Sequence, residues 1–103
     1  MLLIREVMYC KPGKVRAMVE KSLAMGKLSA KLGQGEMRIM TDFCAERYWT
    51  IVTEYEVPSM QAFEEMMQGQ GQSSESMKEM ENIMKGYHDL VEFGRREIYK
   101  IEG

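Results

Sequence analysis

The sequence has 103 residues, of which 45% are hydrophobic and 29% are charged, and its formal net charge is -2. This size and composition indicate one soluble globular domain with a single core, spanning residues 1–103. The charges are spread evenly and form no basic stripe or acidic tail, so we expect no nucleic-acid partner.

The apolar start of the chain is short, because Arg5 and Glu6 interrupt it before a signal peptide or membrane span is complete. We therefore expect a cytoplasmic protein with no membrane partner. Cys10 and Cys44 lack C-x-x-C spacing, and one histidine is too few to complete an ordinary structural zinc site with them. We expect reduced thiols with no disulfide between them, no metal and no cofactor.

The first predicted strand runs from Leu2 to Cys10 and has apolar side chains on both faces, which is typical of a strand covered on both sides. Pro12 and Gly13 end it. Helical periodicity predicts a helix over residues 14–32, which Gly33 ends. Its predicted buried stripe is Val15, Met18, Val19, Ser22 and Leu23.

Two strands are predicted next, over residues 36–43 and 48–57, with residues 44–47 as a hairpin loop. The strand over residues 36–43 alternates between a more polar and a more apolar face. The second is rich in β-branched and aromatic residues, and its pattern places Trp49 and Tyr55 on one apolar face.

The C-terminal half predicts two helices and a last strand. Ser59 is the expected N-cap of a helix with Met60, Phe63, Met66 and Met67 inside, and residues 69–74 have the composition of a mobile loop. Ser76 and Glu79 form a capping box, which predicts a helix that begins there and ends at Gly94. Its inward residues would be Met77, Met80, Met84, Tyr87 and Val91. Residues 95–102 alternate as a strand.

This order of elements predicts an α+β ferredoxin-like fold. Two β-α-β units with right-handed crossovers give a four-stranded antiparallel sheet in the order 4-1-3-2, with the helices on one face. The other face is then bare. Because the first strand is apolar on both sides, we expect a second copy to cover that face, which makes the protein a homodimer.

The element order, with Lys11-Pro12-Gly13-Lys14 after the first strand and Arg95-Arg96-Glu97-Ile98-Tyr99 in the last, resembles the dimeric α+β barrel superfamily. Within it, the chain is most similar to small NIPSNAP-like and antibiotic-biosynthesis-monooxygenase-like proteins. The resemblance implies a barrel made by two copies, with an apolar cavity between the helices and the sheet of each.

The sequence departs from two patterns of these relatives. NIPSNAP-like proteins tend to place an Arg and a Tyr two residues apart in the first strand, where this chain reads Glu6-Val7-Met8. Haem-degrading members of the superfamily pair a His and a Trp with an Asn in the first strand, whereas the only Asn here is Asn82, in the third helix. That constellation is therefore incomplete.

The candidate chemical groups are His88 and Glu6, which could handle protons near neutral pH. The alternatives are that His88 is a half-exposed helix residue with no function and that Glu6 forms a salt bridge. Aromatic and methionine side chains could form the walls of an apolar ligand pocket, although such side chains more often form a core or an interface. These candidates are Trp49, Tyr55, Met84 and Tyr87.

Two functions are consistent with this pattern. The first is a protein without defined catalysis, which either binds an apolar or aromatic small molecule between helices and sheet or is a structural dimer. The alternative is a cofactor-independent monooxygenase or isomerase acting on an aromatic or polyketide-like substrate. A pocket of about 300 Å³ or more that contains His88 or Glu6 would favour the enzyme. A filled interior would favour the first function.

Overall fold

The computed structural model describes residues 1–69 and 73–103, and its elements follow the order expected from the sequence. In chain order they are β1 (Leu2–Cys10), α1 (Val15–Lys31), β2 (Arg38–Thr41), β3 (Thr50–Val57), α2 (Met60–Met67), α3 (Ser74–Met84), the 3-10 helix η1 (Tyr87–Asp89) and β4 (Val91–Lys100). No helix in the described ranges is long and apolar enough to cross a membrane.

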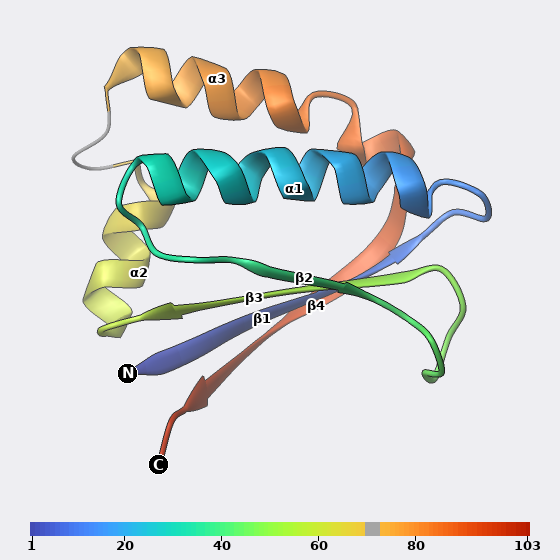
Figure 1. Ribbon diagram of the computed structural model, residues 1–103, viewed down its shortest axis with the longest axis horizontal. Coiled ribbons are helices and arrows are strands. Elements are labelled where there is room, and N and C mark those ends of the chain that lie inside the picture. The colour runs from blue at the N-terminus through green and yellow to red at the C-terminus, as the bar shows by residue number, and fades with distance from the viewer. Residues whose placement is uncertain (70–72) are drawn as a thin grey trace.

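The sheet has the order β2-β3-β1-β4 with antiparallel neighbours, which confirms the predicted α+β ferredoxin-like topology. The central strand β1 pairs with β3 from Leu2 opposite Val57 to Tyr9 opposite Thr50. The helices all lie on one side of the sheet (Figure 1). We call the helix-covered side the inner face and the opposite side the outer face.

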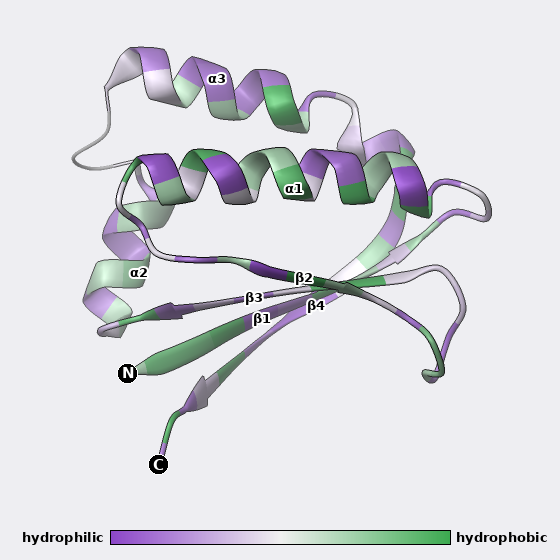
Figure 2. Ribbon diagram, viewed as in Figure 1, coloured by the Kyte–Doolittle hydropathy of each residue, from purple (hydrophilic) through white to green (hydrophobic). Residues whose placement is uncertain are grey.

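The core lies between the inner face and the helices, in two clusters of buried residues. One contains Ile4, Tyr55, Val57 and Phe63, and the other contains Cys10, Met18, Val19 and Ile51. Apolar residues gather along α1 and the first half of β1, whereas β4 is largely hydrophilic through its middle (Figure 2). Burial in α1 follows the predicted stripe except at Leu23, which is exposed.

The third helix begins and ends earlier than the sequence predicted. Its N-cap is Ser73, whose Oγ accepts a hydrogen bond from the Ser76 N–H at 3.1 Å, so the predicted capping box at Ser76 and Glu79 is wrong. The helix ends at Met84 and not at Gly94, because Gly86 takes a left-handed φ of 84° and turns the chain into η1. Of the predicted mobile loop, residues 70–72 lie outside the described residues and Ser74 is already helical.

The strands differ from the predicted ones mainly around Trp49. This residue has a φ of 62°, which an extended strand excludes, so β3 begins only at Thr50. The expectation that Trp49 and Tyr55 share one face of a strand is therefore wrong. The segment before it is held by Asp42, whose Oδ1 accepts a hydrogen bond from the Thr50 N–H at 2.8 Å.

Candidate functional site

A pocket of 150 Å³ lies between the inner face and the helices. Five of its eleven lining residues are methionines, from α1, the segment before β2, α2 and α3: Met25, Met37, Met66, Met67 and Met80. Methionine side chains are flexible and polarizable, so such walls can adjust to the shape of a ligand. The buried Tyr55 of β3 and the half-buried Glu6 of β1 add polar groups to this apolar lining.

Glu6 is held by Arg96, which lies opposite it in the pairing of β1 with β4. Arg96 donates to Oε1 of Glu6 from Nε at 2.7 Å, and its Nη2 lies 2.5 Å from the same oxygen as an ion pair. The Arg96 guanidinium also lies 5.2 Å from the ring centroid of Phe63. No described residue donates a hydrogen bond to the second oxygen, Oε2. Glu6 is therefore an ion-paired carboxylate with one oxygen left for a ligand.

Tyr55 supplies a hydroxyl that stays protonated. Burial, and then the negative charge of Glu6, raise the pKa of Tyr55 to about 12, against a smaller lowering by Arg96. The side chain is only 9% exposed, and none of the described residues forms a hydrogen bond with its hydroxyl. This group can therefore donate to or accept from a molecule in the pocket.

The other residues predicted from the sequence lie outside this pocket. His88 is exposed in η1, with its ring 4.0 Å from that of Tyr87, and Met84 and Tyr87 pack against the core cluster of Met18. Trp49 is in the loop before β3. The structure thus brings together Glu6 and Tyr55, and a role for His88 in proton transfer stays a prediction.

Sequence reasoning missed Met25 and Met37 as pocket residues, although it placed Met66, Met67 and Met80 on inward helix faces. The sequence does contain one indication of the pocket's position. Glu6 is the one acidic residue on the face of β1 that also carries Ile4 and Met8. A carboxylate on an otherwise apolar face requires a partner or a function, because burying an unpaired charge costs free energy.

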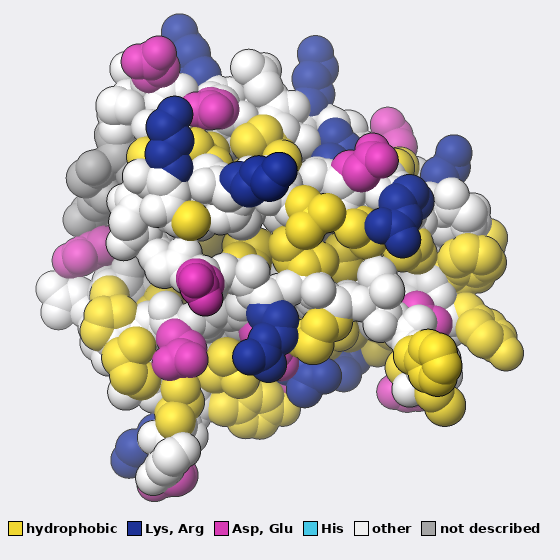
Figure 3. Space-filling model, viewed as in Figure 1, with side chains coloured by type: hydrophobic (Ala, Val, Ile, Leu, Met, Phe, Trp, Pro, Cys, Tyr) yellow, Lys and Arg dark blue, Asp and Glu magenta, His cyan; other side chains and the backbone are white. Residues whose placement is uncertain are grey.

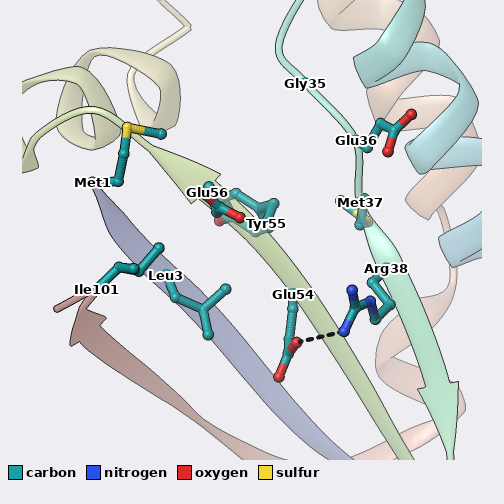
Figure 4. A pocket seen from close by; sticks show the side chains of 10 residues that line it. All are labelled: Met1, Leu3, Gly35, Glu36, Met37, Arg38, Glu54, Tyr55, Glu56 and Ile101. Carbon is teal, nitrogen blue, oxygen red and sulfur yellow. Dashed lines mark ion pairs between the residues drawn. The ribbon is translucent and has the colours of Figure 1, made fainter. Parts of the chain in front are cut away.

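A larger hollow of 760 Å³ adjoins the pocket at the sheet edge and shares residues 35–37 and Tyr55 with it. Figure 4 shows this hollow, with Leu3 and Glu54 projecting from neighbouring strands and Arg38 turned towards Glu54, 4.0 Å away. Three carboxylates, those of Glu36, Glu54 and Glu56, line it against a single arginine. Its polar lining makes it a poorer site for an apolar molecule than the methionine pocket, with which it shares four lining residues.

A row of paired charges crosses the outer face. Arg5 lies opposite Glu54 on one side and Glu97 on the other, at 3.6 Å and 4.0 Å. Arg38 extends the row to β2, and Arg95 binds Glu97 at 2.7 Å within β4. Hydrogen bonds from Arg95 and then from the Tyr99 hydroxyl hold the pKa of Glu97 below its usual value. The row therefore presents matched charges with little net charge.

Apolar groups are also exposed away from the pocket. Phe43 and Tyr48, in the loop between β2 and β3, are 105% and 83% exposed. Hydrophobic side chains lie along the boundary of α1 and β2 and gather again at this loop (Figure 3). In the part of the chain that the structure describes, no three His, Cys, Asp or Glu side chains are placed to hold a metal ion.

No family model and no curated protein sequence matches this chain. Solved structures of similar fold include a protein from Agrobacterium tumefaciens with 17% identity and a TM-score of 0.74, over 97% of this chain and 92% of that one. A NIPSNAP-like domain protein from Burkholderia xenovorans, described as uncharacterized, gives 8% identity and a TM-score of 0.74, over 98% and 84%.

A NIPSNAP family protein from Agrobacterium tumefaciens gives 9% identity and a TM-score of 0.72, over 96% of this chain and 90% of that one. At such identities the similarity shows the fold alone. The prediction of a NIPSNAP-like α+β fold is thereby confirmed.

Proposed function

We propose that this protein is a homodimer in which each subunit binds a small apolar or aromatic molecule between its helices and its sheet. The observation that carries the proposal is the pocket, which is lined by five methionines and also by Glu6 and Tyr55. An apolar cavity of about 150 Å³ accommodates a single aromatic ring. The pocket of 150 Å³ thus suits a ligand of that size.

The outer face supports the dimer. Val7 is 3% exposed, while Val52 opposite it and Leu3 are half-buried, so apolar side chains flank the charged row. Charges that already have partners within one subunit cost less to bury than unpaired charges. A second copy is the expected cover for this face, since isologous pairing is the commonest arrangement of soluble oligomers. Both cysteines are free, which suits the reducing cytoplasm predicted from the sequence.

The alternative function is a cofactor-independent isomerase or monooxygenase. In its favour, the Glu6 carboxylate, paired with Arg96, and the protonated Tyr55 hydroxyl line one pocket, so a base and an acid are available to one ligand. Against it, the pocket is half the volume expected for an aromatic or polyketide-like substrate of several rings, and His88 lies outside. Binding is therefore the function that the geometry supports better.

Methionine methyl NMR tests the proposal directly, because the chain has 12 methionines of which only some line the pocket. We would titrate protein labelled at the methionine methyl groups with indole. The five pocket methionines should shift together and saturate. Met1 and Met60, exposed and outside the pocket, should not move. Shifts spread evenly over all methionines, or none at millimolar indole, would contradict a binding site.

The enzymatic alternative needs its own measurement. An isomerase that uses Glu6 as a base would exchange a carbon-bound proton of a bound aromatic ketone with deuterated water. Exchange that disappears in Glu6→Gln would establish the alternative. Binding without exchange would leave the protein as a carrier or sensor of its ligand.

A further inference from the structure

The polar groups of the methionine pocket are arranged around an unused negative charge. The hydrogen bond from Nε of Arg96 and the ion-pair contact of its Nη2 both go to Oε1 of Glu6, and no described residue donates to Oε2. At the rim, Glu36 is exposed and forms no ion pair with any described residue. A purely apolar ligand would leave the Oε2 acceptor without a partner, and desolvating an acceptor without a compensating hydrogen bond is unfavourable.

The balance of charge at the Tyr55 hydroxyl has the same sign. At the Tyr55 hydroxyl, the charge of Glu6 outweighs that of Arg96, although the two groups form an ion pair. Five thioethers line the pocket, so it screens charge less than bulk water does. An anionic ligand would be repelled there, and a cation would be attracted.

We propose that the ligand of this pocket is a protonated apolar or aromatic amine, whose ammonium group donates to Oε2 of Glu6 and to the hydroxyl of Tyr55. Its apolar part lies among the methionines, at the ring-edge contacts that thioethers favour. An ammonium has three donors and no acceptor, which matches a free carboxylate oxygen and a phenol oxygen. This inference rests on the proposed binding function and specifies its ligand class.

Three probes of nearly equal size separate charge from shape: benzylamine, benzyl alcohol and benzoate. Each would be titrated into the wild-type protein near neutral pH, with binding followed at the methionine methyl groups. We expect benzylamine to bind about tenfold more tightly than benzyl alcohol, because a charge-assisted hydrogen bond replaces a neutral one. Benzoate should bind more weakly than either.

Two glutamine variants locate the effect. Glu6→Gln should bring the affinities of benzylamine and benzyl alcohol within about twofold of each other, since it removes the charge and keeps the shape. Glu20→Gln is the matched control, on the exposed side of α1 and outside the pocket, and it should keep the preference for the amine. A preference that survives in Glu6→Gln would overturn the inference. If Glu6→Gln does not fold, the order of the three affinities for the wild-type protein still tests the ligand class: benzylamine must bind most tightly and benzoate most weakly.

The outcomes distinguish the ligand class from the binding function. If benzyl alcohol or benzoate binds as tightly as benzylamine, the amine class is wrong and the pocket remains a binding site. If none of the three shifts the pocket methionines, both the binding function and the ligand class fail.

Discussion

Gly94 of β4 passes so close to Val7 of β1 that a Cβ atom added to it would lie 2.6 Å from the Val7 carbonyl oxygen. The neighbouring contact, with Cα of Met8, would be 3.2 Å. Both are backbone atoms of the central strand, which cannot move aside as a flexible side chain can. Gly94 is therefore required by the pairing of β1 with β4, the same pairing that sets Arg96 opposite Glu6.

Gly94→Ala should accordingly lower the free energy of unfolding by about 1–3 kcal/mol, the usual range for overpacking. Chemical denaturation followed by circular dichroism measures it. Gly103→Ala is the control, since nothing lies within 4 Å of a Cβ at that position. Equal stabilities of the two variants would mean that β4 does not approach β1 as closely as described.

The role of Gly94 illustrates what the sequence could predict and what it could not. Apolar periodicity indicates long segments well, so the element order was predictable. The predicted inner stripe of α2 is only partly correct, because Phe63 is buried and Met66 half-buried while Met60 and Met67 are exposed. The sequence predicts a helix end at Gly94 because glycine stops helices, and nothing local to Gly94 reveals the Val7 carbonyl, which is distant along the chain. The same limitation applies to Met25 and Met37, which meet the other pocket methionines only through the tertiary fold.

Lys21 joins α1 to the end of α3, and its removal should loosen that helix. Its Nζ donates to the carbonyl oxygens of Ile83 and Lys85 at 3.1 Å and 2.6 Å, where the carbonyls at a helix end lack partners within the helix. Lys21→Met should cost about 1 kcal/mol in the free energy of unfolding, as expected for the loss of hydrogen bonds to a charged donor.

The control for Lys21 is Lys27→Met, on the same helix but exposed. Hydrogen exchange should show faster opening of α3 in the Lys21 variant only. Unchanged exchange in α3 would mean that these contacts contribute nothing in solution.

Val52 tests the proposed dimer, since it lies half-buried on the outer face between Val7 and Met40. Val52→Lys would place an unpaired charge in the interface and should convert a dimer, twice 12.0 kDa, into monomers. Light scattering coupled to size exclusion measures the mass. Ala17→Lys adds the same charge on the exposed side of α1 and should leave the dimer intact. A wild-type protein that is already monomeric would refute the dimer.

The high pKa of Tyr55 predicts a loss of stability in alkali. Because its pKa is about 12 in the folded protein against an ordinary 10, the folded state holds the proton more tightly than the unfolded state. This contribution is complete below pH 10 and disappears as the pH rises from 10 to 12. Urea denaturation below pH 10 and close to pH 12 should therefore show a smaller loss in Tyr55→Phe than in wild type. Equal losses of stability in the wild type and in Tyr55→Phe would mean that groups other than Tyr55 cause the loss in alkali.

His88 provides the sharpest contrast between the prediction from sequence and the geometry. Sequence reasoning made it the first proton-handling candidate, whereas the structure places it exposed in η1, stacked on Tyr87 and outside the methionine pocket. We therefore expect His88→Ala to leave benzylamine affinity within about twofold of wild type, as for a surface substitution, with a stability change of about 0.5 kcal/mol or less. Glu6→Gln, measured beside it, should lose the preference for the amine. If His88→Ala weakens binding while Glu6→Gln does not, the ligand enters at the η1 end of the molecule and the histidine, not the glutamate, meets it.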